Sequence, residues 1–223
     1  KMKIPARLLI FDLDGTMIDS VQDIAETANI VGGRYNCPVH TIDSIKAHLG
    51  DGLRALVRGI LSDERARDVD LVEQIAKEFL SEYDQHLLKH TKFYPGVEQF
   101  LDLFAERNGI KVGIVSNKPE YQSRQIIRGL GLEECRFVQI FGGDTFEVKK
   151  PDPKPLNEMI RLAEVQPNQT VMIGDSRADV LAAQAAGTQF IGVTFGYNPV
   201  VKLQGFGAQL FIDSFEELPS LLI

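Results

Sequence analysis

One stretch of this sequence decides the fold: Arg7-Leu8-Leu9-Ile10-Phe11-Asp12-Leu13-Asp14-Gly15-Thr16. Its first half is a short, continuous apolar run, and polar groups with a glycine follow at once. Such a run is typical of a strand that is buried on both faces and opens at its carboxyl end into a loop. Strands of this kind occur mainly in parallel sheets covered by helices, so the stretch favours an α/β protein.

Similar short apolar runs recur along the chain, and most of them adjoin segments with helical periodicity. The further expected strands are residues 110–115, 137–141, 170–173, 190–193 and 209–212. The expected helices include one with Val97, Leu101 and Phe104 on a single face and one over 178–186 that Gly187 ends. Strands that alternate with helices imply βαβ units, and hence a doubly wound parallel sheet.

One segment breaks this alternation. Residues 18–93 show helical patterning and no convincing strand, with one apolar stripe running from Val72 to Leu87. A second stripe, from Ile42 to Ile60, is interrupted at Gly50-Asp51-Gly52. A helical block inserted after the first strand predicts a small cap over the core. We therefore expect a core domain of residues 1–17 and 94–223 and a helical cap domain of residues 18–93.

Composition narrows the possible partners of this chain. Its 223 residues carry a net charge of -7, which argues against nucleic acid because a phosphate backbone is bound by a basic surface. No apolar run approaches the roughly 20 residues of a membrane span, and the first residues lack the apolar core of a signal peptide. Cys37 and Cys135 stand far apart and are expected to be reduced thiols. We expect a cytoplasmic protein, a monomer or weak homodimer, with no membrane or nucleic-acid partner.

Four motifs carry candidate chemistry, and the first is in the opening stretch. Asp12 and Asp14 stand two residues apart, so in an extended segment both carboxylates face one side while Leu13 packs on the other. Converging carboxylates at the end of a buried strand repel each other and lose hydration, and a hard divalent cation is the usual remedy. The alternative is an accidental pair in an acidic chain, or a turn begun by Asp14-Gly15.

Two further motifs also follow expected strands or loops. Ser116 and Asn117 end the strand over 110–115, where a hydroxyl, an amide and the free N–H groups of a helix start suit phosphate oxygens. Both residue types are also ordinary helix caps. Lys150 precedes Pro151, which restricts its backbone and can aim its ammonium at a fixed anion. The alternative for this lysine is a solvated, charged loop.

The fourth motif is Gly174-Asp175-Ser176-Arg177-Ala178-Asp179, after the strand over 170–173. Asp175 and Asp179 lie one helical turn apart and could hold a cation directly or through water. The alternative is an acidic helix start that the helix dipole stabilises. All four motifs fall near the carboxyl ends of expected strands, where open α/β sheets bind ligands. Together they predict a metal-assisted phosphate site.

These motifs resemble those of the haloacid dehalogenase superfamily, in its phosphatase branch. The matching residues, in order, are Phe11-Asp12-Leu13-Asp14-Gly15-Thr16, Ser116-Asn117, Lys150-Pro151-Asp152-Pro153 and Gly174-Asp175-Ser176-Arg177-Ala178-Asp179. The resemblance covers nearly the whole chain, including a cap inserted after the first strand. Within the superfamily the chain looks most like the phosphoglycolate phosphatases, in residues 15–20, 49–54 and 93–97.

The resemblance implies a role for each catalytic residue. Asp12 would attack phosphorus and form an aspartyl-phosphate. Asp14 would protonate the leaving alkoxide and then activate water for the second step. Ser116 and Lys150 would neutralise the transferring phosphoryl oxygens.

The resemblance also implies the ligands of a magnesium ion. Mg²⁺ would be held by Asp12, the backbone carbonyl of Asp14 and Asp175, with Asp179 close by or behind them. The expected substrate-binding residues are Thr16, Ser116, Asn117, Lys150 and Arg54. Arg54, after the glycine break in the cap, could pair with a substrate carboxylate, although an exposed helix-surface arginine is the alternative.

The expected reaction is therefore magnesium-dependent hydrolysis of a small phosphorylated metabolite of the phosphoglycolate type. Three alternatives remain open at this point. A sugar-phosphate mutase similar to β-phosphoglucomutase would pass the phosphoryl group back to its substrate, and a pyrophosphatase or nucleotidase would differ only in its cap pocket. A non-catalytic phosphate sensor would have lost one of Asp12, Asp14, Lys150 or Asp175, and all four are present.

Overall fold

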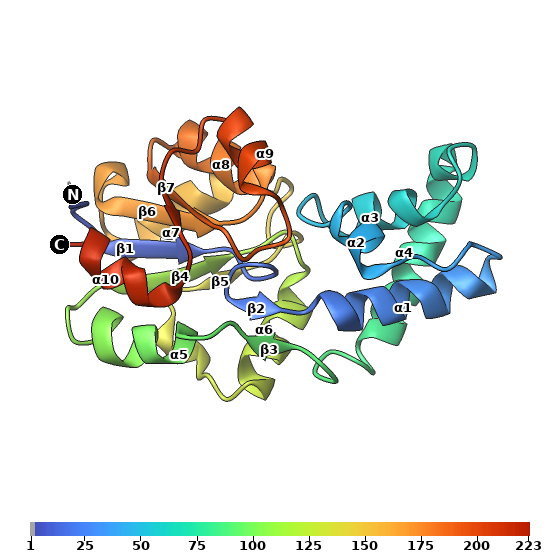
Figure 1. Ribbon diagram of the computed structural model, residues 1–223, viewed down its shortest axis with the longest axis horizontal. Coiled ribbons are helices and arrows are strands. Elements are labelled where there is room, and N and C mark those ends of the chain that lie inside the picture. The colour runs from blue at the N-terminus through green and yellow to red at the C-terminus, as the bar shows by residue number, and fades with distance from the viewer. Residues whose placement is uncertain (1–2) are drawn as a thin grey trace.

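The computed structural model describes residues 3–223 and folds them into a sheet-containing part and a helical part, seen side by side in Figure 1. The strands of the larger part are β1 (Leu8–Phe11), β4 (Lys111–Val115), β5 (Ile140–Phe141), β6 (Thr170–Gly174), β7 (Gln189–Val193) and β8 (Phe211–Ile212). Within the described residues they form one six-stranded sheet in the order β5-β4-β1-β6-β7-β8, and every neighbouring pair is parallel. The expected parallel α/β fold is confirmed.

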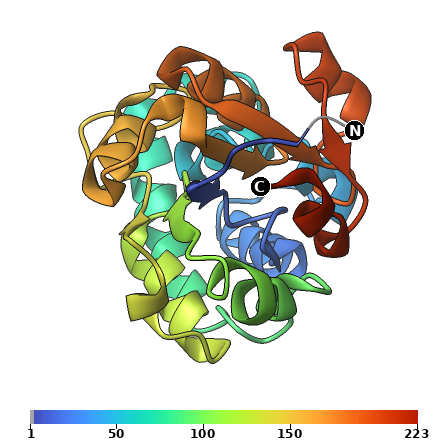
Figure 2. The ribbon, with the colours of Figure 1, turned by 90° about the vertical axis from the view of Figure 1, so that its left-hand side faces the viewer.

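Helices cover both faces of this sheet because its side chains alternate between them. Leu8 and Ile10 pack into one apolar cluster together with residues of α7 (Lys154–Ala163) and α8 (Arg177–Ala186). Their neighbours Leu9 and Phe11 belong to a second cluster on the opposite face. The helices of that face are α5 (Val97–Phe100), α6 (Glu120–Gly129) and α10 (Leu218–Leu221). Figure 2 shows the two helical layers with the sheet between them.

The central position of β1 brings the expected motifs together. Phe11, its last residue, pairs with Ile114 of β4 on one side and with Ile173 of β6 on the other. The chain leaves all three strands at the same edge of the sheet. Asp12 follows β1 and Asp175 follows β6, so their side chains emerge next to each other at the edge where such sheets bind ligands.

The smaller part is a block of helices inserted between β1 and β4, on the right in Figure 1. Its helices are α1 (Val21–Arg34), α2 (Ile42–Lys46), α3 (Leu53–Ile60) and α4 (Val69–Tyr83). The expected apolar stripe is buried along α4, at Val72, Ile75 and Phe79, where the helix packs on α1 and α3. Among residues 3–223, no helix is both long and apolar enough to cross a lipid bilayer.

The expectation of no strand in residues 18–93 is wrong at both ends of that segment. β2 (Ile18–Asp19) and β3 (Lys92–Phe93) form a short antiparallel ribbon in which Ile18 pairs with Phe93. Strands of two residues are too short to show alternation, so no periodic signal marks them. For the same reason the strand expected over 137–141 is overestimated, because only its last two residues pair with β4.

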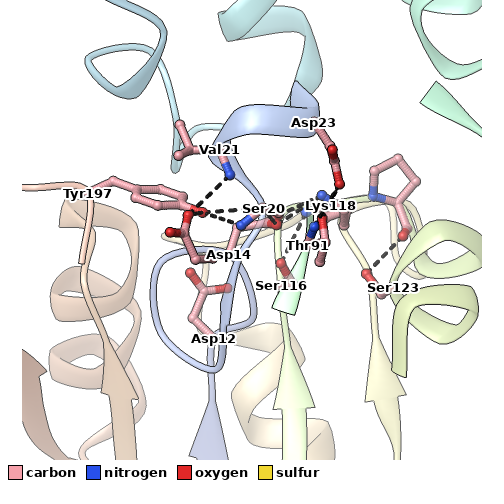
Figure 3. A network of polar contacts seen from close by, with 12 residues as sticks. Asp12, Asp14, Ser20, Val21, Asp23, Thr91, Ser116, Lys118, Ser123 and Tyr197 are labelled. Atoms are coloured by element: carbon pink, nitrogen blue, oxygen red, sulfur yellow. Dashed lines mark hydrogen bonds and ion pairs between the residues drawn. The ribbon is translucent and has the colours of Figure 1, made fainter. Parts of the chain in front are cut away.

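A buried carboxylate ties the beginning of the helical block to its end. Asp23, in the first turn of α1, is fully buried. Its carboxylate accepts the backbone N–H of His90 at 3.0 Å. It also accepts the backbone N–H of Thr91 at 2.8 Å and the Thr91 hydroxyl at 2.7 Å (Figure 3). A buried charge is stable when donors surround it in this way. The two connections to the core are therefore fixed to each other.

Replacing this carboxylate should lower the stability of the protein. Asp23→Ala leaves the N–H groups of His90 and Thr91 and the Thr91 hydroxyl without this acceptor, and we expect a loss of about 2 kcal/mol in the free energy of unfolding. In thermal denaturation that corresponds to a fall of roughly 4–8 °C in Tm. Asp63→Ala, at an exposed position of the same block, is the matched control. Equal Tm values for the two variants would contradict the role of Asp23.

Candidate active site

Three buried carboxylates meet at the carboxyl edge of the sheet. Asp12 follows β1, Asp175 follows β6, and Asp179 lies in the first turn of α8. One oxygen of each lies within 4.8 Å of the others, and all three side chains are buried. Hard carboxylate oxygens in such a group are the ligands that Mg²⁺ prefers, so the donor set fits this ion.

Lys150 supplies positive charge to the same group. Its Nζ lies 2.9 Å from Oδ1 of Asp12 and 2.6 Å from Oδ1 of Asp179, and it also donates to the carbonyl of Val115. Although burial lowers the pKa of Lys150, the two carboxylates outweigh it and raise the pKa above its usual value. The ammonium therefore stays charged, and one lysine faces three carboxylates.

The remaining excess of negative charge is visible in the pKa of the acids. Burial, reinforced by Asp179 and opposed by Lys150, raises the pKa of Asp12 to about 7. Burial and the charges of Asp12 and Asp179 raise the pKa of Asp175 well above its usual range. Oδ1 of Asp12 has an ion pair but no aligned hydrogen bond within residues 3–223. Within residues 3–223, Lys150 is the one cation paired with this group, and a divalent cation would offset the remaining negative charge.

Asp179 and Asp175 differ in how much of each carboxylate is already engaged. Oδ1 of Asp179 contacts Lys150, and its Oδ2 accepts the N–H and hydroxyl of Ser176 at 2.9 and 2.7 Å. Oδ2 of Asp175 accepts the N–H of Tyr197 at 2.6 Å. Asp179 thus completes the capping box that Ser176 begins at the start of α8, as well as belonging to the acidic group, which favours a supporting position behind Asp12 and Asp175.

Asp14 does not belong to this group of three carboxylates. Figure 3 shows it above Asp12, beyond the end of β1. Both of its oxygens are 2.9 Å from Nζ of Lys118, and Oδ1 also accepts the hydroxyl of Ser20. Gly15 makes the turn beyond it with φ +80°, and a Cβ there would lie 2.5 Å from Oδ2 of Asp175. Only glycine allows this close approach of the loop to the acidic group.

Lys118 is a site residue that the sequence interpretation missed. It is buried, and Asp14 and Tyr83 raise its pKa although burial alone would lower it. A single lysine two residues after Ser116 has no pattern that would have marked it in the sequence. Tyr197 was missed as well: its hydroxyl accepts the N–H of Ser20 at 2.8 Å, but it follows β7 in a loop without any recognisable pattern.

The expected phosphate-binding residues are all buried near this edge, with different partners. Ser116 accepts the N–H of Lys118 at 3.2 Å, and the hydroxyl of Thr16 has no hydrogen-bond partner in the described part of the chain. Asn117 donates through Nδ2 to the carbonyls of Gly50 at 2.8 Å and Lys150 at 2.9 Å. The amide expected to bind substrate thus joins the helical block to the core.

The glycine break in the helical block approaches the core closely, as expected. Gly50 has φ +103°, and a Cβ there would lie 3.0 Å from Cβ of Ser176. Gly52 has φ +88°, and a Cβ there would lie 3.3 Å from the carbonyl oxygen of Asn117. A side chain at either position would be strained and would meet the core, so the loop can descend onto the site only with glycines.

A cavity separates the acidic edge from the helical block. Its volume is about 70 Å³, room for roughly five water molecules. Asp12, Asp14, Ser116 and Lys118 lie on the core side. Leu49, Leu53, Leu56, Phe79, Leu80 and Tyr83 lie on the opposite side. A polar floor under an apolar roof suits a small ligand whose charged end faces the core.

Arg54 is placed outside this cavity. Its guanidinium pairs with both carboxylate oxygens of Glu73 on α4, and 61% of its side chain is exposed. This position agrees with the alternative of an exposed helix-surface arginine.

Comparisons with known proteins identify close relatives. A family model described as "Haloacid dehalogenase-like hydrolase" matches residues 9–193. The chain is 37% identical to a phosphoglycolate phosphatase of Chromobacterium violaceum, over 97% of this chain and 96% of the relative. It is 36% identical to a phosphoglycolate phosphatase of Colwellia psychrerythraea, over 95% and 94%. A crystal structure described as a predicted phosphoglycolate phosphatase from Haemophilus somnus superposes with a TM-score of 0.88, at 25% identity and 97% coverage of both chains.

The acidic group should make metal binding depend on pH. Folding raises the pKa of Asp12 from 3.8 to about 7, so the protonated form of Asp12 contributes to the stability of the folded protein at low pH. Without metal, this contribution is lost as the pH rises from about 4 to about 7. Mg²⁺ competes with that proton and should raise Tm more at pH 8 than at pH 5, by roughly 5–10 °C when its concentration is 100 times Kd. Differential scanning fluorimetry with magnesium and with chelator measures the shift.

Asp175→Asn is the control for this experiment, because it removes one expected carboxylate ligand and hardly changes the size of the side chain. Its Tm should not respond to magnesium at either pH. The same magnesium shift in this variant and in the original protein would place the ion elsewhere, and no shift in the original protein would argue against a magnesium site.

Proposed function

This chain belongs to the haloacid dehalogenase-like hydrolase family, and we propose that it hydrolyses a small phosphorylated metabolite of the phosphoglycolate type. The family and the relatives place it among the phosphoric monoester hydrolases. One observation carries the proposal. Asp12 lies beside Lys150 in a buried carboxylate group that fits Mg²⁺, and Asp14 stands two residues away at the edge of a small cavity.

In the first step, a carboxylate oxygen of Asp12 forms a bond to phosphorus while the bond from phosphorus to the leaving oxygen breaks. Lys150 holds the Asp12 carboxylate in place and remains charged, so it can also offset charge on the phosphoryl oxygens. Mg²⁺, when bound by Asp12, Asp175 and the backbone carbonyl of Asp14, would supply the further positive charge that this transfer requires.

Asp14 serves as the acid and then as the base of the reaction. It gives its proton to the leaving oxygen in the first step and takes a proton from water in the second, when that water attacks phosphorus and frees Asp12. Lys118 and Ser20 fix the carboxylate at the cavity edge, away from the three clustered acids. This separation allows Asp14 to handle protons while Asp12 remains the nucleophile.

In this proposal Ser116, which lines the cavity, and Thr16, whose buried hydroxyl has no partner within residues 3–223, contact the phosphoryl group. Asn117 has a different role in this proposal. Its amide nitrogen holds the loop of Gly50 over the site, which leaves Oδ1 without a partner among residues 3–223. We propose that Asn117 positions the cap rather than binding phosphate through its nitrogen.

The size of the cavity supports a small substrate. A hexose phosphate or a nucleotide would require a larger opening of the cap above this cavity of about 70 Å³ than a two-carbon phosphate ester, which weighs against a mutase or nucleotidase. A phosphate sensor needs no nucleophile or acid, yet Asp12 and Asp14 both keep their carboxylates at the cavity. The proposal therefore favours hydrolysis of a small phosphate ester over a mutase, a nucleotidase or a sensor, and the assay with pyrophosphate tests the remaining alternative.

The division into domains and the cellular location are part of the same proposal. We propose that residues 18–93 act as a cap that opens about the β2–β3 ribbon, since the cavity lies between this block and the core formed by 1–17 and 94–223. Cys37 and Cys135 are free thiols, which agrees with a cytoplasmic location. A monomer or weak homodimer remains our expectation for the oligomeric state.

Phosphate release tests the proposed function. The substrates are phosphoglycolate, glucose 1-phosphate, AMP, pyrophosphate and 4-nitrophenyl phosphate, each assayed with magnesium and with chelator. We expect phosphoglycolate to be preferred and Asp12→Asn to lose at least about 1,000-fold in kcat/KM, because the amide is not a nucleophile.

Asp12→Asn also removes one of three mutually repelling charges. Its Tm in chelator should therefore equal or exceed that of the original protein, which separates lost chemistry from lost folding. Metal-independent release, or full activity of the variant, would refute the mechanism. Preference for the hexose phosphate, the nucleotide or pyrophosphate would select the corresponding alternative.

A further inference from the structure

The roof of the cavity offers a substrate few polar contacts. Its side chains include Leu49, Leu53, Leu56, Phe79 and Leu80, which neither donate nor accept hydrogen bonds. Among the lining residues, all of them within the described range, Lys118 is the one positively charged side chain. If the substrate has a second anionic group besides its phosphoryl group, Lys118 is therefore the cation at the cavity wall that can bind it.

Tyr83, at the end of α4, is the polar exception in the roof. Its side chain is buried, and its hydroxyl has no hydrogen-bond partner within residues 3–223. A buried, unpaired hydroxyl is costly and rare in folded proteins. Burial raises the pKa of Tyr83 to about 12, so the group remains a donor at neutral pH. The hydroxyl is available for a ligand that enters the cavity.

Lys118 and Tyr83 lie next to each other although they come from opposite sides of the cavity. Nζ of Lys118 is 4.7 Å from the centre of the Tyr83 ring. The ammonium has three N–H donors, and its two described hydrogen bonds both go to the carboxylate of Asp14. Lys118 follows β4 in the core and Tyr83 ends a cap helix, so this donor pair spans both parts of the protein.

We propose that Lys118 and the Tyr83 hydroxyl together bind the carboxylate of a short phosphorylated carboxylic acid. This assignment rests on the proposed function and names the residues that select its substrate. One carboxylate oxygen accepts from the ammonium and the other from the hydroxyl, while the phosphoryl group lies at Asp12. The apolar roof strengthens both contacts because it excludes water from around them.

This assignment replaces Arg54 as the partner of the substrate carboxylate. Arg54 already pairs with Glu73 on the cap surface and is not among the residues that line the cavity. Because one donor is on the cap and the other on the core, the pair is complete only when the cap lies over the site. A substrate with a carboxylate would therefore favour the closed cap, whereas one without it would not.

The test compares phosphoglycolate with ethyl phosphate, which has a leaving group of the same length but no carboxylate. The quantity measured is the ratio of kcat/KM for the two substrates, which cancels effects on Asp14 and on the phosphoryl group. We expect Tyr83→Phe to lower this ratio about tenfold and Lys118→Gln to lower it roughly 10–100-fold. Tyr35→Phe, which removes a cap hydroxyl bonded to Glu78, should leave the ratio unchanged.

Thermal denaturation provides a second readout for the hydroxyl. Tyr83→Phe should have a Tm equal to or above that of the original protein, because it removes an unpaired buried group. If Lys118→Gln does not fold, this variant still decides the matter. An unchanged ratio in Tyr83→Phe would overturn the subsite. The subsite would also be overturned if Arg54→Gln lowered the ratio and Lys118→Gln did not.

The proposed function and the subsite fail in different ways. If the original protein releases no phosphate from either compound, the proposed function is overturned and the subsite with it. If it releases phosphate from both at similar kcat/KM, phosphatase chemistry stands and the carboxylate subsite alone is overturned.

Discussion

Repulsion among Asp12, Asp175 and Asp179 is the constraint on which the rest of the structure depends. Parallel pairing of β1 with β6 forces the first two acids together at a buried edge, where their charges cannot be hydrated. Lys150 offsets part of this charge, and its burial is stable only because the acids surround it. Such an arrangement is unfavourable for folding but well suited to a reaction that brings in a cation and a phosphoryl group together.

The core of the fold and the main chemical groups were predictable from sequence because each depends on a local pattern. The apolar run ending at Phe11 marks a buried strand, and acids directly after such strands must lie at one edge of a parallel sheet. Lys118, Tyr83 and the β2–β3 ribbon were not predictable. They gain their significance from contacts between distant segments, and two-residue strands or single side chains carry no periodicity.

The two parts of the protein divide the work between charge and shape. The core contributes nearly all of the ionisable groups at the cavity, whereas the cap contributes mainly apolar surface and backbone. Asn117 joins these roles because one amide group holds both the cap loop at Gly50 and the backbone of Lys150. Movement of the cap loop is thereby connected to the segment that carries the main cation of the acidic group.

The hydrogen bonds of Asp23 with His90 and Thr91 have a consequence for the order in which the chain folds. Leu8 pairs with Lys111, so the sheet must close a long loop that includes the whole helical block. Once α1 to α4 have packed, Asp23 and the β2–β3 ribbon hold the entry and exit of the block together. The pairing of β1 with β4 then requires the closure of only a short loop. This favours a folding route in which the inserted block forms early and guides assembly of the sheet.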